Sequence, residues 1–182
     1  MKQANTRILT FAMIAFIFIA CTSEKTKLAN AIKADEEILR SDSNGTMNKE
    51  VLTRTMHNYL EYATKFPDDT ISPEYLVRAA DLSNGIREYQ QSIDLFRKVY
   101  TMYPEHRKAA AALFMEGFVF ETSMHQKDSA KAIYSEFIRR YPDHVLAASA
   151  KASLDQLNNN LSDEELIRMF EARADSANKK SN

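Results

Sequence analysis

The sequence is poor in residues that interrupt helices. Its 182 residues include only 3 Gly, 4 Pro and no Trp, whereas 45% are hydrophobic and 27% are charged. Gly and Pro are the residues that cost most inside a helix, and this apolar fraction is enough to bury a core. The length favours one domain with short extensions. We therefore expect an all-α fold.

An excess of basic residues is also missing. The formal net charge is -1, from 24 Lys and Arg against 25 Asp and Glu. Without Lys2 and Arg7 in the first 20 residues, 22 basic against 25 acidic residues leave -3. Because a protein that binds duplex nucleic acid needs a strongly basic face, we expect no nucleic-acid partner.

Motifs for catalysis and metal binding are absent from the sequence. Cys21 is the only cysteine, which excludes an intramolecular disulfide and a thiol-based zinc or redox motif. There is no HExxH motif, and the three glycines build no GxGxxG motif or P-loop. We therefore expect no enzyme, no metal and no cofactor. A pocket that places His57 or His125 beside a carboxylate would favour an enzyme instead.

The first 21 residues have the outline of a secretory signal peptide. Lys2 and Arg7 are followed by an apolar run over residues 8–20, which ends at Cys21. The run has 13 residues, whereas a membrane-spanning helix needs about 20. Residues 1–20 are therefore expected to be removed.

The last four residues of this segment, Phe18-Ile19-Ala20-Cys21, resemble the bacterial lipobox. The usual residue at the first position is Leu, and the second is usually smaller than Ile19. The resemblance implies that Cys21 is lipidated and begins the mature chain. Its acyl chains would anchor the protein stably to a membrane. The alternative is an ordinary signal peptide that ends in a cysteine by chance.

An aromatic-Pro-acid signal recurs three times along the chain. The three segments are Phe66-Pro67-Asp68-Asp69, Tyr103-Pro104-Glu105-His106 and Tyr141-Pro142-Asp143-His144. Between the last two segments a constant offset of 38 pairs Tyr75 with Leu113, Ala79 with Gly117, Leu82 with Phe120, Phe96 with Tyr134 and Val99 with Phe137. A fixed period of this length predicts a helical repeat. The repeat also accounts for His106 and His144, which end two of the turns.

These positions resemble the tetratricopeptide repeat (TPR), a helical hairpin with an aromatic, a small and an aromatic residue on its first helix and Ala, Phe and Pro on its second. The stronger match uses Leu113, Gly117, Phe120, Ala130 and Pro142. Arg78 and Glu116 depart from the motif, which has Leu there, and each hairpin has one extra loop residue. The resemblance implies antiparallel helical hairpins stacked as a short TPR-like solenoid.

Local signals set the expected boundaries. Ser72-Pro73 predicts a helix start, Gly85 a helix end, and Ser162 to Glu165 a capping box. Helices are expected at residues 26–40, 48–66, 73–84, 88–103, 106–123, 128–141, 144–157 and 163–175. The expected domains are a signal peptide over 1–20, an anchored linker and helix over 21–46, the array with its capping helix over 47–176, and a tail over 177–182.

Over residues 48–170 the chain resembles the TPR lipoproteins of Gram-negative envelopes, the group that includes BamD of outer-membrane barrel assembly and the division coordinator CpoB. The resemblance implies a scaffold that binds envelope proteins and is lipid-anchored in the outer membrane, facing the periplasm. It would assist envelope assembly or maintenance. The alternative function is a protein that captures a peptide or glycan near the membrane.

In TPR arrays the concave face binds partners. The positions of that face imply a candidate groove that consists of Leu76, Ala80, Ser83, Phe114, Phe118, Glu121 and Gln156. The alternative for Phe114 and Phe118 is packing against neighbouring helices, because an array of about three units leaves little room for a deep groove.

Overall fold

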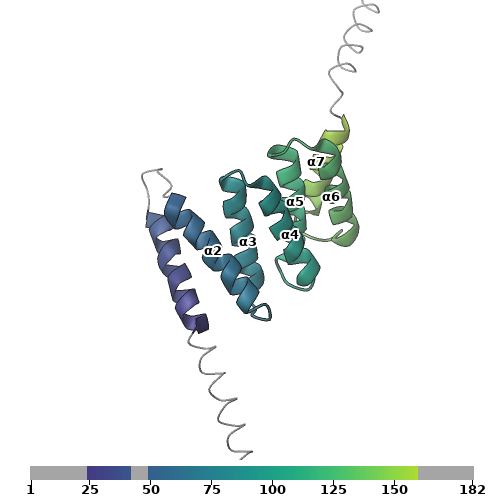
Figure 1. Ribbon diagram of the computed structural model, residues 1–182. Coiled ribbons are helices and arrows are strands. Elements are labelled where there is room, and N and C mark those ends of the chain that lie inside the picture. Colours follow the sequence, from purple (N-terminus) through teal and green to yellow (C-terminus); the bar gives the residue numbers. More distant parts are fainter. Residues whose placement is uncertain (1–23, 42–48, 160–182) are drawn as a thin grey trace, which may run out of the picture. The chain divides into compact units, whose positions relative to one another are not determined.

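The computed structural model describes residues 24–41 and 49–159, and every regular element in these ranges is a helix. A helix over residues 24–41 precedes the helices labelled in Figure 1. These are α2 (Lys49–Lys65), α3 (Ser72–Gly85), α4 (Tyr89–Met102), α5 (Ala109–Thr122), α6 (Lys127–Arg140) and α7 (Ala147–Asn159). The all-α prediction is confirmed. The expected boundaries differ from the observed ones by at most three residues, as at the start of α5, expected at 106 and found at 109.

The chain divides into two compact units. One ends at Ala112 and the other begins at Leu113, so the division falls inside α5. The helix over residues 24–41 belongs to the first unit together with α2, α3 and α4. Cys21, the signal segment and the closing helix expected at residues 163–175 lie outside the described residues.

The first unit consists of helices that pack in sequence order. Helix α2 contacts α3, and α3 contacts α4 (Figure 1). In α4 the fully buried residues Ile93, Phe96 and Val99 recur at intervals of three, which places them on one apolar face. Tyr75 lies at the α2–α3 contact, stacked on Tyr59 with ring centroids 5.1 Å apart and edge-on to Tyr62 at 4.9 Å.

Polar contacts join the first helix to α2. Asp35 is buried and accepts hydrogen bonds from Arg54 Nη2 at 2.6 Å and from Asn58 Nδ2 at 3.0 Å. At one end of the pair, Glu24 forms a salt bridge with Lys65. Because residue 24 lies opposite residue 65 and residue 35 opposite 54, the two helices run antiparallel and form a hairpin.

The second unit is built around two buried rings of α6. Tyr134 and Phe137 are fully buried, and Phe114 of α5 packs on both, with ring centroids 5.5 Å and 5.7 Å away. On α7, Ala150 and Leu157 are buried, and α7 contacts α6. The predicted hairpin of α5 and α6 is therefore present.

Two of the predicted helix caps are corrected by the structure. Ser72 is the first residue of α3 rather than its N-cap, and its hydroxyl donates to the carbonyl of Phe66 at 2.6 Å. Gly85 is the last residue of α3, and the left-handed backbone follows two residues later at Arg87, with φ of 69°. His125, 38 residues further on, has φ of 55°. The loop of each of these two hairpins thus contains one residue with left-handed backbone.

Candidate functional site

The three aromatic-Pro-acid segments form the same turn between helices. In each, the backbone N–H of the fourth residue donates to the carbonyl of the aromatic residue: Asp69 to Phe66 at 3.0 Å, His106 to Tyr103 at 3.0 Å and His144 to Tyr141 at 3.2 Å. The proline ends the preceding helix because it has no N–H to donate. The helices α2, α4 and α6 accordingly end one residue before the aromatic residue.

The fourth residue of each turn also accepts a hydrogen bond with its side chain. Asp69 Oδ1 accepts from the N–H of Ile71 at 3.0 Å. His106 Nδ1 accepts from the N–H of Lys108 at 3.2 Å, and His144 Nδ1 from that of Leu146 at 3.1 Å. An imidazole nitrogen can accept only when it carries no proton. The two histidines therefore have a structural role as caps, which explains their recurrence.

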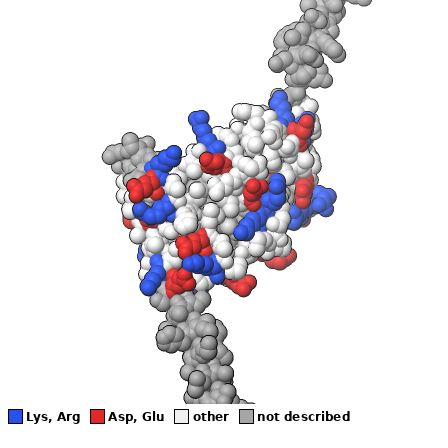
Figure 2. Space-filling view, viewed as in Figure 1, with Lys and Arg blue, Asp and Glu red and all other residues white. Residues whose placement is uncertain are grey.

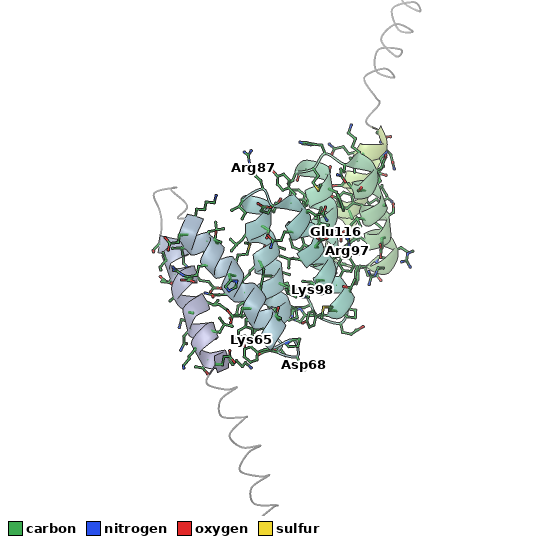
Figure 3. All side chains as sticks on the ribbon, in the orientation of Figure 1. Lys65, Asp68, Arg87, Arg97, Lys98 and Glu116 are labelled. Carbon is green, nitrogen blue, oxygen red and sulfur yellow. The ribbon has the colours of Figure 1, made fainter. Side chains whose placement is uncertain are left out.

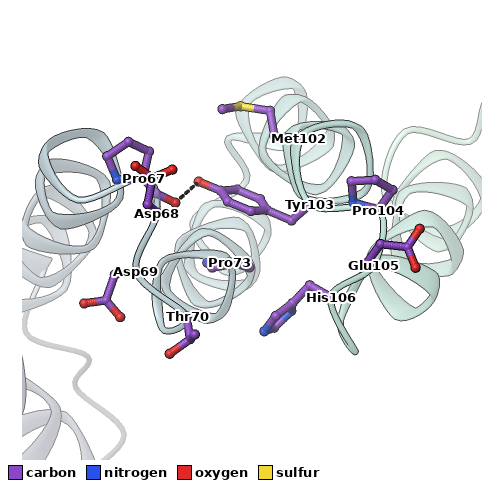
Figure 4. Close-up of a pocket in the computed structure, with 10 residues that line it drawn as sticks. All are labelled: Pro67, Asp68, Asp69, Thr70, Pro73, Met102, Tyr103, Pro104, Glu105 and His106. Atoms are coloured by element: carbon purple, nitrogen blue, oxygen red, sulfur yellow. Dashed lines mark hydrogen bonds between the residues drawn. The ribbon is translucent and has the colours of Figure 1, made fainter.

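The first two turns enclose a hollow of about 530 Å³ in the first unit (Figure 4). Its apolar lining comes from Pro67, Pro73, Met102, Tyr103 and Pro104, and its polar lining from Asp68, Asp69, Thr70, Glu105 and His106. The hydroxyl of Tyr103 donates to the carbonyl of Pro67 at 3.0 Å and so joins the two turns. Burial, and secondarily the charge of Asp68, raises the pKa of Tyr103.

Two tyrosines of α2, Tyr59 and Tyr62, are buried. Tyr59 donates to Glu36 at 2.7 Å, and Tyr62 donates to Asp69 at 2.8 Å. Burial and these carboxylate partners raise the pKa of both phenols well above the usual value. Both tyrosines are therefore neutral hydrogen-bond donors at physiological pH and are unsuited to act as general bases.

The structure separates the candidate groove residues into two groups. Leu76, Ala80 and Ser83 are buried, and the hydroxyl of Ser83 donates to the carbonyl of Ala79 at 2.8 Å. In this structure these three side chains have almost no free surface for a partner. Their small or compact side chains fit the close packing of α3 instead.

The remaining groove residues lie in the second unit. Phe114 packs on α6, which favours the alternative of packing for this residue. Glu121 accepts from the Tyr134 hydroxyl at 2.7 Å. Phe118 is 39% exposed, and Gln156 is exposed on α7. Only Phe118 therefore offers a large apolar surface from this set.

The remaining two histidines lie at the surface of the described residues. His57 Nε2 is 3.7 Å from Glu61 Oε2 on the same helix, with 73% of the histidine side chain exposed. His125 lines a loop hollow made only of the consecutive residues 125–129. A search of the two described ranges found no group of three His, Cys, Asp or Glu residues that could hold a metal ion. It also found no helix long and apolar enough to cross a bilayer.

Charged residues show no segregation by sign in Figure 2. Lysines and arginines lie beside aspartates and glutamates over both units on the face shown. Figure 3 illustrates one such neighbourhood, with Lys65 near the end of α2 and Asp68 in the turn that follows it. The face shown therefore carries no continuous basic patch.

The close packing at Gly117 supports the 38-residue repeat register that the sequence predicts. A methyl group added at Gly117 would stand 2.9 Å from Cε1 of Tyr134 and 3.2 Å from Cγ2 of Ile133. Only glycine allows α5 and α6 to approach this closely. The family model described as tetratricopeptide repeat matches residues 111–144, which span this contact. Residues 111–144 are therefore similar to a tetratricopeptide repeat. The predicted TPR-like fold class is thereby confirmed.

Among solved structures, similar chains include a crystal structure of MamA and the TPR domain of Arabidopsis OM64. The MamA chain is 24% identical, with 88% of this chain and 95% of that chain covered and a TM-score of 0.44. The OM64 domain is 15% identical, with 72% and 99% covered and a TM-score of 0.46. A comparison with curated proteins found no match.

The sequence did not indicate several polar contacts of the TPR hairpins. Arg78, which replaces the Leu of the motif, forms an ion pair with Glu36 of the first helix and lies over the ring of Tyr75. Glu116, at the same position of the next repeat, is buried. The departure at Arg78 was visible in the sequence, but the motif alone could not show that its partner lies 42 residues earlier.

Proposed function

We propose that this protein is a scaffold whose TPR hairpins bind other proteins in the bacterial cell envelope. The observation that carries the proposal is the TPR at residues 111–144, because stacked helical repeats expose extended surfaces that proteins use for binding partners. Phe118, Glu121 and Gln156 remain the candidate contact residues of the second unit.

A lipid anchor at Cys21 forms part of this proposal. It is supported by the sequence Phe18-Ile19-Ala20-Cys21, which follows a short apolar run. Residue 24, the first that the structure describes, is already helical and lies three positions after the proposed lipidated cysteine. The folded units would thus be held close to the membrane surface, where they assist envelope assembly or maintenance.

Membrane fractionation and metabolic labelling test the anchor. Wild-type protein is expected in the membrane pellet and labelled by a radioactive fatty acid, whereas Cys21→Ser is expected in the soluble fraction and unlabelled. Ser23→Ala is the matched control, since it changes a neighbouring residue without removing the thiol. Unchanged labelling and sedimentation of Cys21→Ser would refute the lipoprotein proposal.

Crosslinking in intact cells tests protein binding. Affinity-tagged wild-type protein is crosslinked, purified in denaturant and analysed by mass spectrometry. A scaffold predicts a reproducible set of partner proteins that is absent from a tagged, unrelated lipoprotein recovered from the same membrane. Recovery of the same proteins with both baits would argue against specific binding by the TPR hairpins.

A further inference from the structure

The hollow between the first two turns is lined by apolar side chains and by three carboxylates, of which Asp69 is paired with Lys25. Its volume of about 530 Å³ falls in the range of ligand pockets, roughly 300–1,000 Å³. Met102 at its edge is 53% exposed, so its side chain is accessible to a bound segment. Both observations concern the first unit alone.

The charges around the hollow are of one sign. Its ten lining residues include three carboxylates, Asp68, Asp69 and Glu105, but neither Lys nor Arg. Asp69 is paired with Lys25. Asp68 and Glu105 are both exposed, and within the described ranges neither forms a salt bridge.

The nearest cations of the following turn are directed elsewhere. Arg107 pairs with Glu74 at 2.5 Å, and Lys108 approaches the same carboxylate at 3.7 Å. Arg107 and Lys108 therefore neutralise Glu74 rather than Asp68 and Glu105. Asp68 and Glu105 therefore remain available to pair with a cation of a bound segment.

We propose that this hollow binds an extended segment of a partner protein that carries a Lys or Arg next to an apolar side chain. The apolar side chain would cover Met102 and the prolines, and the cation would pair with Asp68 or with Glu105, which lie at opposite ends of the hollow (Figure 4). A hollow of this size holds a short segment rather than the face of a domain. The inference rests on the proposed function and assigns to it a second surface, separate from Phe118.

The test uses full-length protein in detergent and two fluorescein-labelled peptides of ten residues. One alternates Lys with Leu, and the other has Glu in place of each Lys. Fluorescence anisotropy measures binding to wild-type protein, to Asp68→Asn/Glu105→Gln and to Met102→Ser. The matched controls are Asp143→Asn, the acid of the third turn, and Val145→Ser, an apolar residue 84% exposed. Thermal melting verifies that each variant is folded.

The proposal predicts binding of the Lys peptide and none of the Glu peptide. Binding of the Lys peptide should weaken about tenfold in Asp68→Asn/Glu105→Gln, which removes the complementary charges, and in Met102→Ser, which removes the apolar contact. Both controls should stay within about twofold of wild type. Equal binding of the two peptides, or equal losses in the controls, would overturn it.

The crosslinking experiment separates the two proposals. If neither peptide binds but wild-type protein still recovers specific partners, the hollow is not the binding site and the scaffold function stands. If the Lys peptide binds as expected but no specific partner is recovered from cells, the hollow can bind such a segment and the proposed scaffold function fails.

Discussion

At the scale of single residues, Gly117 is held at a position where no side chain fits. Tyr134 cannot move aside easily, because its ring is fully buried and its hydroxyl is bonded to Glu121. Gly117→Ala should therefore overpack the α5–α6 contact and lower the free energy of unfolding by about 1 to 3 kcal/mol. Urea denaturation followed by circular dichroism measures the change.

Gly85→Ala is the matched control for this prediction. A methyl group at Gly85 would meet nothing within 4 Å, and Gly in a helix is less stable than Ala by about 0.5–1 kcal/mol. The control should be as stable as wild type or slightly more so. Equal destabilisation of both variants would mean that backbone effects, and not Tyr134, explain the loss at Gly117.

Asp69 acts both as a cap and as a charged partner. Burial alone would raise the pKa of its carboxyl. Lys25, the Ile71 N–H and Tyr62 together lower that pKa by more, so that the net shift is downward. A carboxyl whose pKa is lower in the folded than in the unfolded state stabilises the fold at pH values above its unfolded pKa. This stabilisation is lost as the pH falls through the folded-state pKa. Wild-type stability should therefore decline at acidic pH.

Substitutions of Asp69 separate its two roles. Asp69→Asn keeps an oxygen that can accept from Ile71 but has no charge to titrate, so its stability should fall less between pH 5 and pH 3 than that of wild type. Asp69→Ala also loses the cap and should cost about 1 kcal/mol at neutral pH. Thermal unfolding across this pH range measures both. An identical pH dependence of Asp69→Asn and wild type would contradict the role of the charge.

At the scale of elements, the first helix depends on Asp35. Removing its partner with Arg54→Ala leaves a buried carboxylate without its cation, which is strongly unfavourable. The helix over residues 24–41 should then open more often, and its amides should exchange faster with deuterium while α6 is unchanged. Arg40→Ala, which removes an exposed pair with Glu37, is the control and should leave exchange unaffected.

The elements themselves were largely predictable from the sequence. Prolines 67, 104 and 142 end helices by a local rule, and the 38-residue offset placed Gly117 against the second helix. Contacts such as Asp35 with Arg54 were not predictable, because a helix pattern specifies which face is apolar but not which polar residues meet across a hairpin. The prediction that Ser72 is the N-cap of α3 was wrong for a related reason, because its hydroxyl donates to the carbonyl of Phe66 instead.

At the scale of the whole molecule, the candidate site was harder to predict than the fold. The groove positions were carried over from other TPR arrays, but the burial of Leu76, Ala80 and Ser83 depends on the particular side chains that cover them. The hollow at Met102 had no sequence signal beyond the recurring turns. It arises because two turns, 37 residues apart at Pro67 and Pro104, come together in space.

The measurement that tests the central claim most directly is site-specific photocrosslinking in living cells. A photoreactive amino acid is placed at position 118 or 102, which are exposed apolar positions, or at Thr64, an exposed polar position on α2. If the TPR hairpins bind proteins, positions 118 or 102 should give discrete adducts with a defined partner that position 64 does not give. If all three positions give only the same diffuse background, the chain does not bind a protein through these surfaces, and the account is wrong.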